Sequence, residues 1–133
     1  MSYTLQSPMP RFKAVAPISG EDINALPVKD LAAAITFFEN ILGFSTSQRT
    51  DLTVTLMRDH VRIGLIQNPN HQPGKAGSLA FAVDDLQAMH HDLTAKGANP
   101  GKFGIDRWDS RQYRTFFLRE PDNGYCFCFH SPL

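Results

Sequence analysis

Two segments of the chain are alike, and this internal repeat constrains the fold more than any other feature. The segment PVKDLAAAITFFENILGF aligns with AVDDLQAMHHDLTAKGAN and sets Asp30 over Asp85, about 55 residues later. In each segment a short strand is followed by an Asp that can cap a helix, by an amphipathic helix, and by a glycine stop at Gly43 or Gly97. Neither half can bury its sheet face alone, so the pattern predicts two modules that share one core.

The hydrophobic pattern around these helices predicts four strands in each half. We expect them at 22–28, 44–50, 52–58 and 61–67, and again at 78–84, near 99–105, at 113–119 and at 125–130. Each half is then a βαβββ module, and the fold class is α+β. The expected parts are an N-terminal arm or stray edge strand over 1–20, a first module over 21–67, a linker over 68–77 (NPNHQPGKAG) and a second module over 78–133, the modules together forming one domain over 21–133.

Composition excludes several classes of function. Thirteen basic and thirteen acidic residues in 133 give a net charge of zero, so we expect no nucleic-acid partner and no membrane surface as partner. No stretch approaches the roughly 18 apolar residues of a membrane helix, and the first residues lack the pattern of a signal peptide. We therefore expect a soluble, cytoplasmic protein. Cys126 and Cys128 alternate on one predicted strand, a spacing that does not suit a disulfide.

Three motifs in order resemble one known family. They are PVKDLAAAITFFENILGF, LAFAVDDLQAMHHDLTAKGA and FFLREPDNGYCFCF, the last close to a DPDGN hairpin. On these motifs, which span about residues 22–130, the chain resembles the vicinal oxygen chelate superfamily of glyoxalase I, extradiol dioxygenases, fosfomycin-resistance enzymes and bleomycin-resistance proteins. The resemblance implies paired βαβββ modules with mixed sheets curled around a cavity, helices outside, and usually a homodimer.

The resemblance also implies where a metal would bind. Metal-using members hold the ion with four ligands, mostly His and Glu. Carried over to this chain, those positions fall on Ile23, Gly64, Ser78 and Phe127. Since Ile, Gly and Phe carry no donor and a Ser hydroxyl is a poor ligand, we expect neither a metal nor another cofactor. Among family members without a metal here, the chain is most similar to the bleomycin-resistance group, which binds and sequesters a drug.

A set of aromatic side chains is the candidate ligand site. If Phe127 faces a cavity, strand alternation turns Tyr125 and Phe129 the same way, and the family's pattern directs Tyr113, Thr115 and Phe117 inward. The expected ligand-binding residues are Trp108, Arg111, Tyr113, Phe117 and Phe127, with Arg111 able to pair an acidic group. The alternative is that these aromatics simply fill the core. The five histidines form no site, and His130 is the best candidate among them.

Three functions stay open at this point. The first is a metal-free protein that binds a small aromatic or amphiphilic molecule, with antibiotic sequestration as one form and no catalytic residue. The second is a metal-dependent enzyme of the superfamily, a lyase, isomerase or dioxygenase, with displaced ligands. The third is an interaction module whose cavity has collapsed. The occupants of the four metal positions favour the first.

Overall fold

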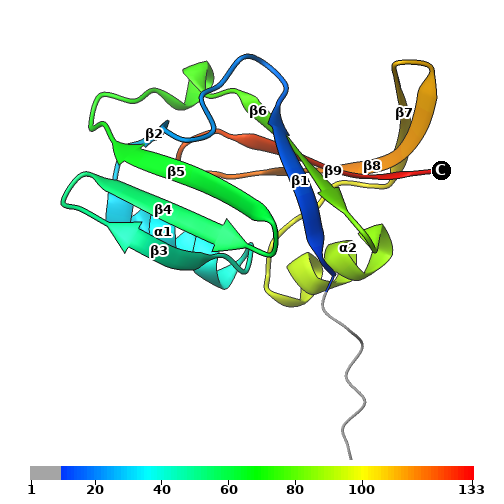
Figure 1. Cartoon of the computed structure of the whole chain (residues 1–133), viewed down its shortest axis with the longest axis horizontal. Coiled ribbons are helices and arrows are strands. Elements are labelled where there is room, and N and C mark those ends of the chain that lie inside the picture. Colours follow the sequence, from blue (N-terminus) through cyan, green and yellow to red (C-terminus); the bar gives the residue numbers. More distant parts are fainter. Residues whose placement is uncertain (1–9) are drawn as a thin grey trace, which may run out of the picture.

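Two mixed β-sheets and two helices make up residues 10–133, the part of the chain that the computed structural model describes (Figure 1). One sheet has the order β2-β5-β4-β3 and the other the order β1-β6-β9-β8-β7. The elements are β1 (Phe12–Pro17), β2 (Leu26–Val28), α1 (Leu31–Asn40), β3 (Ser45–Arg49), β4 (Thr53–Arg58), β5 (Val61–Gln67), the 3-10 turn η1 (Pro73–Lys75), β6 (Ser78–Val83), α2 (Leu86–Ala95), β7 (Gly104–Trp108), β8 (Arg111–Arg119) and β9 (Cys126–Pro132). Neither helix is long and apolar enough to cross a bilayer.

The predicted α+β class is confirmed, and the local signals behind it act as expected. The carboxylate of Asp30 accepts a hydrogen bond from the backbone N–H of Ala33, and Asp85 does the same at the start of α2. In each half the first strand is parallel to the last, β2 with β5 and β6 with β9. The strand expected near 99–105 lies later, at Gly104–Trp108. Pro100 has no N–H to offer a neighbouring strand, although the N–H of Gly101 donates to the carbonyl of Phe117 on β8 at 2.8 Å.

One hydrophobic core joins the two halves. The ring of Phe127 on β9 lies 6.5 Å from that of Phe37 and 5.8 Å from that of Phe38, both on α1. Phe12 on β1 packs 5.7 Å from Phe44 in the first half and 5.2 Å from the Phe81 ring of β6 in the second. Both helices and the helix-facing sides of both sheets thus contribute to a single cluster.

Strand β1 extends the second sheet. It pairs antiparallel with β6 and forms one edge, so residues 12–17 of the expected arm are an edge strand. The arm's first nine residues lie outside the described part of the chain.

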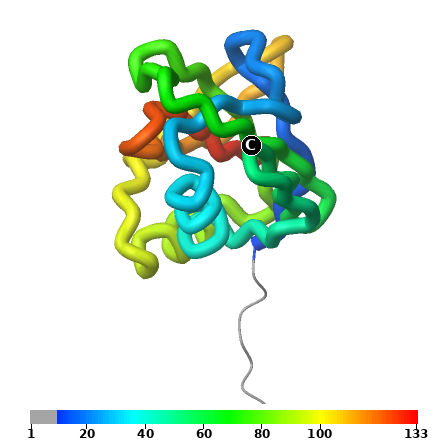
Figure 2. Tube along the Cα trace, turned by 90° about the vertical axis from the view of Figure 1, so that its left-hand side faces the viewer, coloured from blue at the N-terminus to red at the C-terminus, as the bar shows by residue number. Residues whose placement is uncertain are grey.

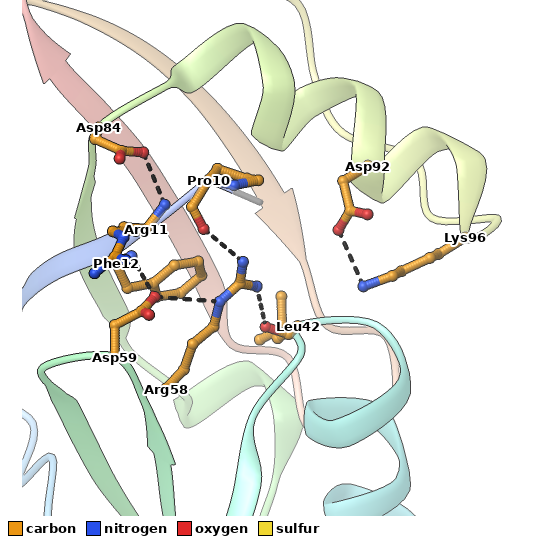
Figure 3. A network of polar contacts seen from close by, with 9 residues as sticks. All are labelled: Pro10, Arg11, Phe12, Leu42, Arg58, Asp59, Asp84, Asp92 and Lys96. Carbon is orange, nitrogen blue, oxygen red and sulfur yellow. Dashed lines mark hydrogen bonds and ion pairs between the residues drawn. The ribbon is translucent and has the colours of Figure 1, made fainter. Parts of the chain in front are cut away.

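A buried arginine holds β1 to the first half (Figure 3). Arg58 donates one hydrogen bond to the carbonyl of Leu42 and one to that of Pro10, each at 2.7 Å. Its guanidinium lies 4.3 Å from the centre of the Phe12 ring, and Asp59 forms an ion pair at 3.7 Å. Burial lowers the pKa of Arg58, an effect that the carboxylate of Asp59 opposes. One side chain thus ties together the arm, the end of α1 and the β4–β5 turn.

The turn between β8 and β9 makes a second set of contacts across the molecule. Glu120 is buried and its carboxylate accepts the backbone N–H of Asn123 at 3.0 Å. The side chain of Asn123 accepts the N–H of Lys29 at 2.9 Å, and its carbonyl accepts a hydrogen bond from Nε2 of His71 at 2.9 Å. Figure 2 shows this orange turn beside the green linker and the start of α1. Glu120 and Asn123 therefore hold this turn in place and join it to the first half and the linker.

We expect Arg58→Met to lower the free energy of unfolding by roughly 3 kcal/mol, because two buried carbonyls and Asp59 lose a charged donor. Arg49→Met, on the exposed strand β3, is the matched control and should change it by less than about 0.5 kcal/mol. Urea unfolding of both variants measures the difference. Equal losses in the two variants would show that the buried network adds nothing.

Candidate functional site

The five-stranded sheet has one face turned away from the helices, which we call the open face. Directly opposed residues of paired strands share a face, so the register between the strands identifies its members. They include Ala14 and Ala16 on β1, Ser78, Ala80 and Ala82 on β6, Cys126, Cys128 and His130 on β9, Arg111, Tyr113, Thr115 and Phe117 on β8, and Asp106 and Trp108 on β7.

Three rings form a cluster on the open face. Trp108 lies 4.8 Å from Tyr113 and 5.1 Å from His130, and Tyr113 lies 5.5 Å from His130, measured between ring centres. The structure brings together Trp108 and Tyr113, both expected at the site, and adds His130, which was not among the expected binding residues. Strand alternation places His130 on the same face as Cys126 and Cys128, so it would have been found if the direction of the β9 side chains had been predicted correctly.

Beside the cluster the open face carries small side chains. Ala80 and Ala82 of β6 are opposite Cys128 and His130 of β9. These small side chains lie in the same face as the three rings and add little bulk to it. Burial raises the pKa of Cys128 to about 12, so its thiol is protonated at neutral pH and is a poor nucleophile.

Arg111 and Phe117 lie at the margins of this face. Arg111 is exposed and opposite Trp108 in the β7–β8 pair, and together with Pro132 it borders a surface hollow of about 590 Å³. Phe117 is opposite Cys128 and 45% exposed, a high value for a phenylalanine. Four of the five expected binding residues, Trp108, Arg111, Tyr113 and Phe117, therefore share one face.

The fifth, Phe127, faces the other way. It is fully buried, opposite Leu118 in the β8–β9 pair, and packs on Phe38 of α1. The predicted direction of Phe127 is wrong, and with it that of Tyr125 and Phe129. Phe117 pairs with Cys128, so Phe127 and Phe117 cannot both point inward. A ring without exposed surface offers a ligand no contact, and for Phe127 the alternative of a core residue is the one observed.

The four inferred metal positions do not converge on a site. Ser78 lies on the open face, whereas Phe127 lies on the helix side of the same sheet. Gly64 has no side chain, and a Cβ there would collide with the backbone of Asn24. The carbonyl of Ile23 accepts the N–H of Gly64 at 2.8 Å, while its side chain packs on the core. Within residues 10–133 no three His, Cys, Asp or Glu side chains are grouped for a metal, so the residues do not fit the metal of other members.

We expect Phe127→Ala to lower the free energy of unfolding by about 3–5 kcal/mol, since it leaves a cavity between β9 and α1. Phe117→Ala removes the same ring from the open face and should cost roughly 1 kcal/mol. Denaturant unfolding followed by circular dichroism measures both. A smaller loss for Phe127→Ala than for Phe117→Ala would contradict the facing of β9 described above.

Comparison with known proteins identifies one family. The family model described as Glyoxalase/Bleomycin resistance protein/Dioxygenase superfamily matches residues 21–129. A search of curated proteins finds no match.

Solved structures of this shape include two proteins associated with bleomycin. A bleomycin resistance determinant encoded on the transposon Tn5 superposes with a TM-score of 0.72 at 19% identity, over 86% of this chain and 98% of that one. A bleomycin-binding protein complexed with bleomycin gives 0.70 at 18% identity, over 86% and 100%. A fosfomycin resistance protein from Listeria monocytogenes, complexed with Mn(II) and sulfate, gives 0.63 at 19% identity, over 87% and 92%. At these identities the likeness shows the fold alone.

Proposed function

The chain belongs to the Glyoxalase/Bleomycin resistance protein/Dioxygenase superfamily, and we propose that it binds a small flat or amphiphilic molecule without a metal. The observation that carries this proposal is the cluster of Trp108, Tyr113 and His130 on the open face. Binding, rather than catalysis, would then be its function, and sequestration of an antibiotic is the form that we propose. One protein of the same shape is complexed with bleomycin, which makes that drug the first probe.

The cluster has the chemistry to hold a planar molecule. Aromatic pairs contribute about 0.5–1.5 kcal/mol beyond the apolar area that they bury. Trp108 and Tyr113 are only partly buried, so their rings keep surface for such a contact. The neighbouring Ala80 and Ala82 add apolar area without blocking access to the sheet.

One charged residue at the rim, Arg111, suits an acidic group on the ligand. Asp106 accepts a hydrogen bond from the hydroxyl of Thr115 at 3.3 Å, which engages part of its carboxylate. Arg111 has no ion-pair partner among residues 10–133 and can offer its planar fork to a carboxylate or phosphate.

We expect metal-free bleomycin to quench the fluorescence of Trp108, the only tryptophan of the chain, in protein treated with a chelator. Trp108→Leu should weaken binding about tenfold, because it removes the stacking surface. Phe103→Leu is the matched control, since Phe103 packs on His90 and Phe116 at the helix side of the sheet and should leave the affinity unchanged. Calorimetry of both variants measures the affinities.

The same titration tests the rival function. Binding or turnover that appears only after one equivalent of Zn, Ni, Mn or Fe is restored would favour a metal-dependent enzyme with displaced ligands. If bleomycin, other planar antibiotics and small carboxylates all leave the protein's thermal stability unchanged at high excess, the proposed function fails.

We also propose that the protein is a homodimer. The first sheet has its own uncovered face, where Ile66 of β5 is 36% exposed while its neighbour Leu65 is buried in the core. Leu52, in the turn before β4, is 54% exposed. A second copy placed against these faces would cover the apolar side chains and enclose the ligand.

We expect Ile66→Asp to convert the dimer to a monomer, because a carboxylate would be desolvated at the interface. Ile105→Asp makes the same change on β7, at a side chain that is 63% exposed and opposite Arg114, away from the open face. This control should remain dimeric. Sedimentation velocity at several concentrations distinguishes the states, and a monomeric parent protein would refute the dimer.

A further inference from the structure

One buried polar atom stands out in residues 10–133. Nδ1 of His130 is shielded from solvent and has neither a hydrogen bond nor an ion-pair partner. The only comparable atom in this part of the chain, Oδ2 of Asp92, lies 3.0 Å from Nζ of Lys96 (Figure 3). A buried polar group without a partner costs stability, so its presence at a candidate binding face calls for an explanation.

The surroundings of His130 supply no partner for Nδ1 from residues 10–133. Its neighbours across the strands are Ala82 on β6 and Thr115 on β8, and the hydroxyl of Thr115 already donates to Asp106. The rings of Trp108 and Tyr113 meet the imidazole at 85° and 87°. Nδ1 of His130 is therefore a polar atom beside two aromatic rings on the open face.

The protonation of His130 determines what it can bind. Burial lowers the pKa of His130, so the ring is neutral at neutral pH. A neutral imidazole has one N–H donor and one acceptor nitrogen. Because a buried N–H without a partner is rarer in proteins than a buried acceptor without one, we infer that the proton is on Nε2 and that Nδ1 carries a lone pair.

We propose that His130 determines specificity by accepting, at Nδ1, a hydrogen bond from an N–H or O–H group of a planar ligand. The ligand class is thus an aromatic heterocycle with a donor in the plane of its ring. This inference rests on the proposed function, because it assigns a polar contact to the same ligand. Since Nδ1 is shielded in the free protein, the ligand reaches it when the ring of Trp108, beside the exposed Asp109–Ser110 turn, moves aside and stacks on the ligand.

Indole and 1-methylindole test the proposal, because they share a ring system and differ in the N–H donor. The single tryptophan gives one indole N–H signal in an NMR spectrum of the labelled protein, and its shift reports binding at Trp108. We expect the parent protein to bind indole about three- to tenfold more tightly than 1-methylindole.

Two variants distinguish the effect of the nitrogen Nδ1 from the effect of the aromatic ring of His130. His130→Phe keeps a ring beside Trp108 and Tyr113 but removes Nδ1, so the preference for indole should fall to about one. His130→Asn places an amide oxygen near the position of Nδ1 and should restore part of the preference. Thermal unfolding controls for folding, and His130→Phe should be no less stable than the parent because it removes an unpartnered polar atom.

The outcomes distinguish the role of His130 from the proposed function. Equal affinities for the two probes in the parent protein, or an unchanged preference in His130→Phe, overturn the role of His130 and leave the proposed function standing. If neither probe moves the signal of Trp108, the inference also fails. The proposed function fails only if bleomycin and the other planar molecules do not bind either.

Discussion

The packing of α1 against β9 is the contact on which the rest of the structure depends. Through Phe37, Phe38 and Phe127, the helix of the first half buries the last strand of the second. Phe12 and Phe44 extend the same core across β1. Because the helix-facing sides of both sheets are committed to this core, the opposite sides are the surfaces left to meet other molecules. The open face follows from how the core is shared.

Sequence reasoning predicted the fold well because its signals are local and repeated. Asp30 and Asp85 begin helices, and Gly43 and Gly97 end them with φ of 72° and 87°, a backbone that glycine adopts freely. Strand boundaries differed by a few residues where turns intervened. The strand expected from residue 22 begins only at Leu26, since the N–H of Ala25 bonds to the carbonyl of Asp22 in a turn.

The candidate site was predicted only in part, and the reason lies in one turn. The family resemblance placed Phe127 at a metal position that faces the cavity, but successive side chains of a strand point to opposite faces of the sheet. An error of one residue in the alignment therefore reverses the direction of the side chain. In the structure Gly124 takes a φ of 82° and the strand continues with Cys126, Cys128 and His130 on the open face. The turn geometry that sets this register depends on contacts with distant segments, which no local pattern contains. Trp108 and Tyr113, on β7 and β8, do lie together on the open face, and their role in binding stays a prediction.

Each sheet buries one face in the shared core and leaves the other face uncovered. This division affects which substitutions the sequence can accept. Substitutions at Ala80 or Tyr113 alter the open face, whereas the rings around Phe127 maintain the architecture. A fold divided in this way can acquire new specificities with little loss of stability. Proteins only 19% identical can then superpose with a TM-score of 0.72, as this chain does with a drug-resistance determinant. The core side of each sheet maintains the shape, and the residues of the other side are free to change.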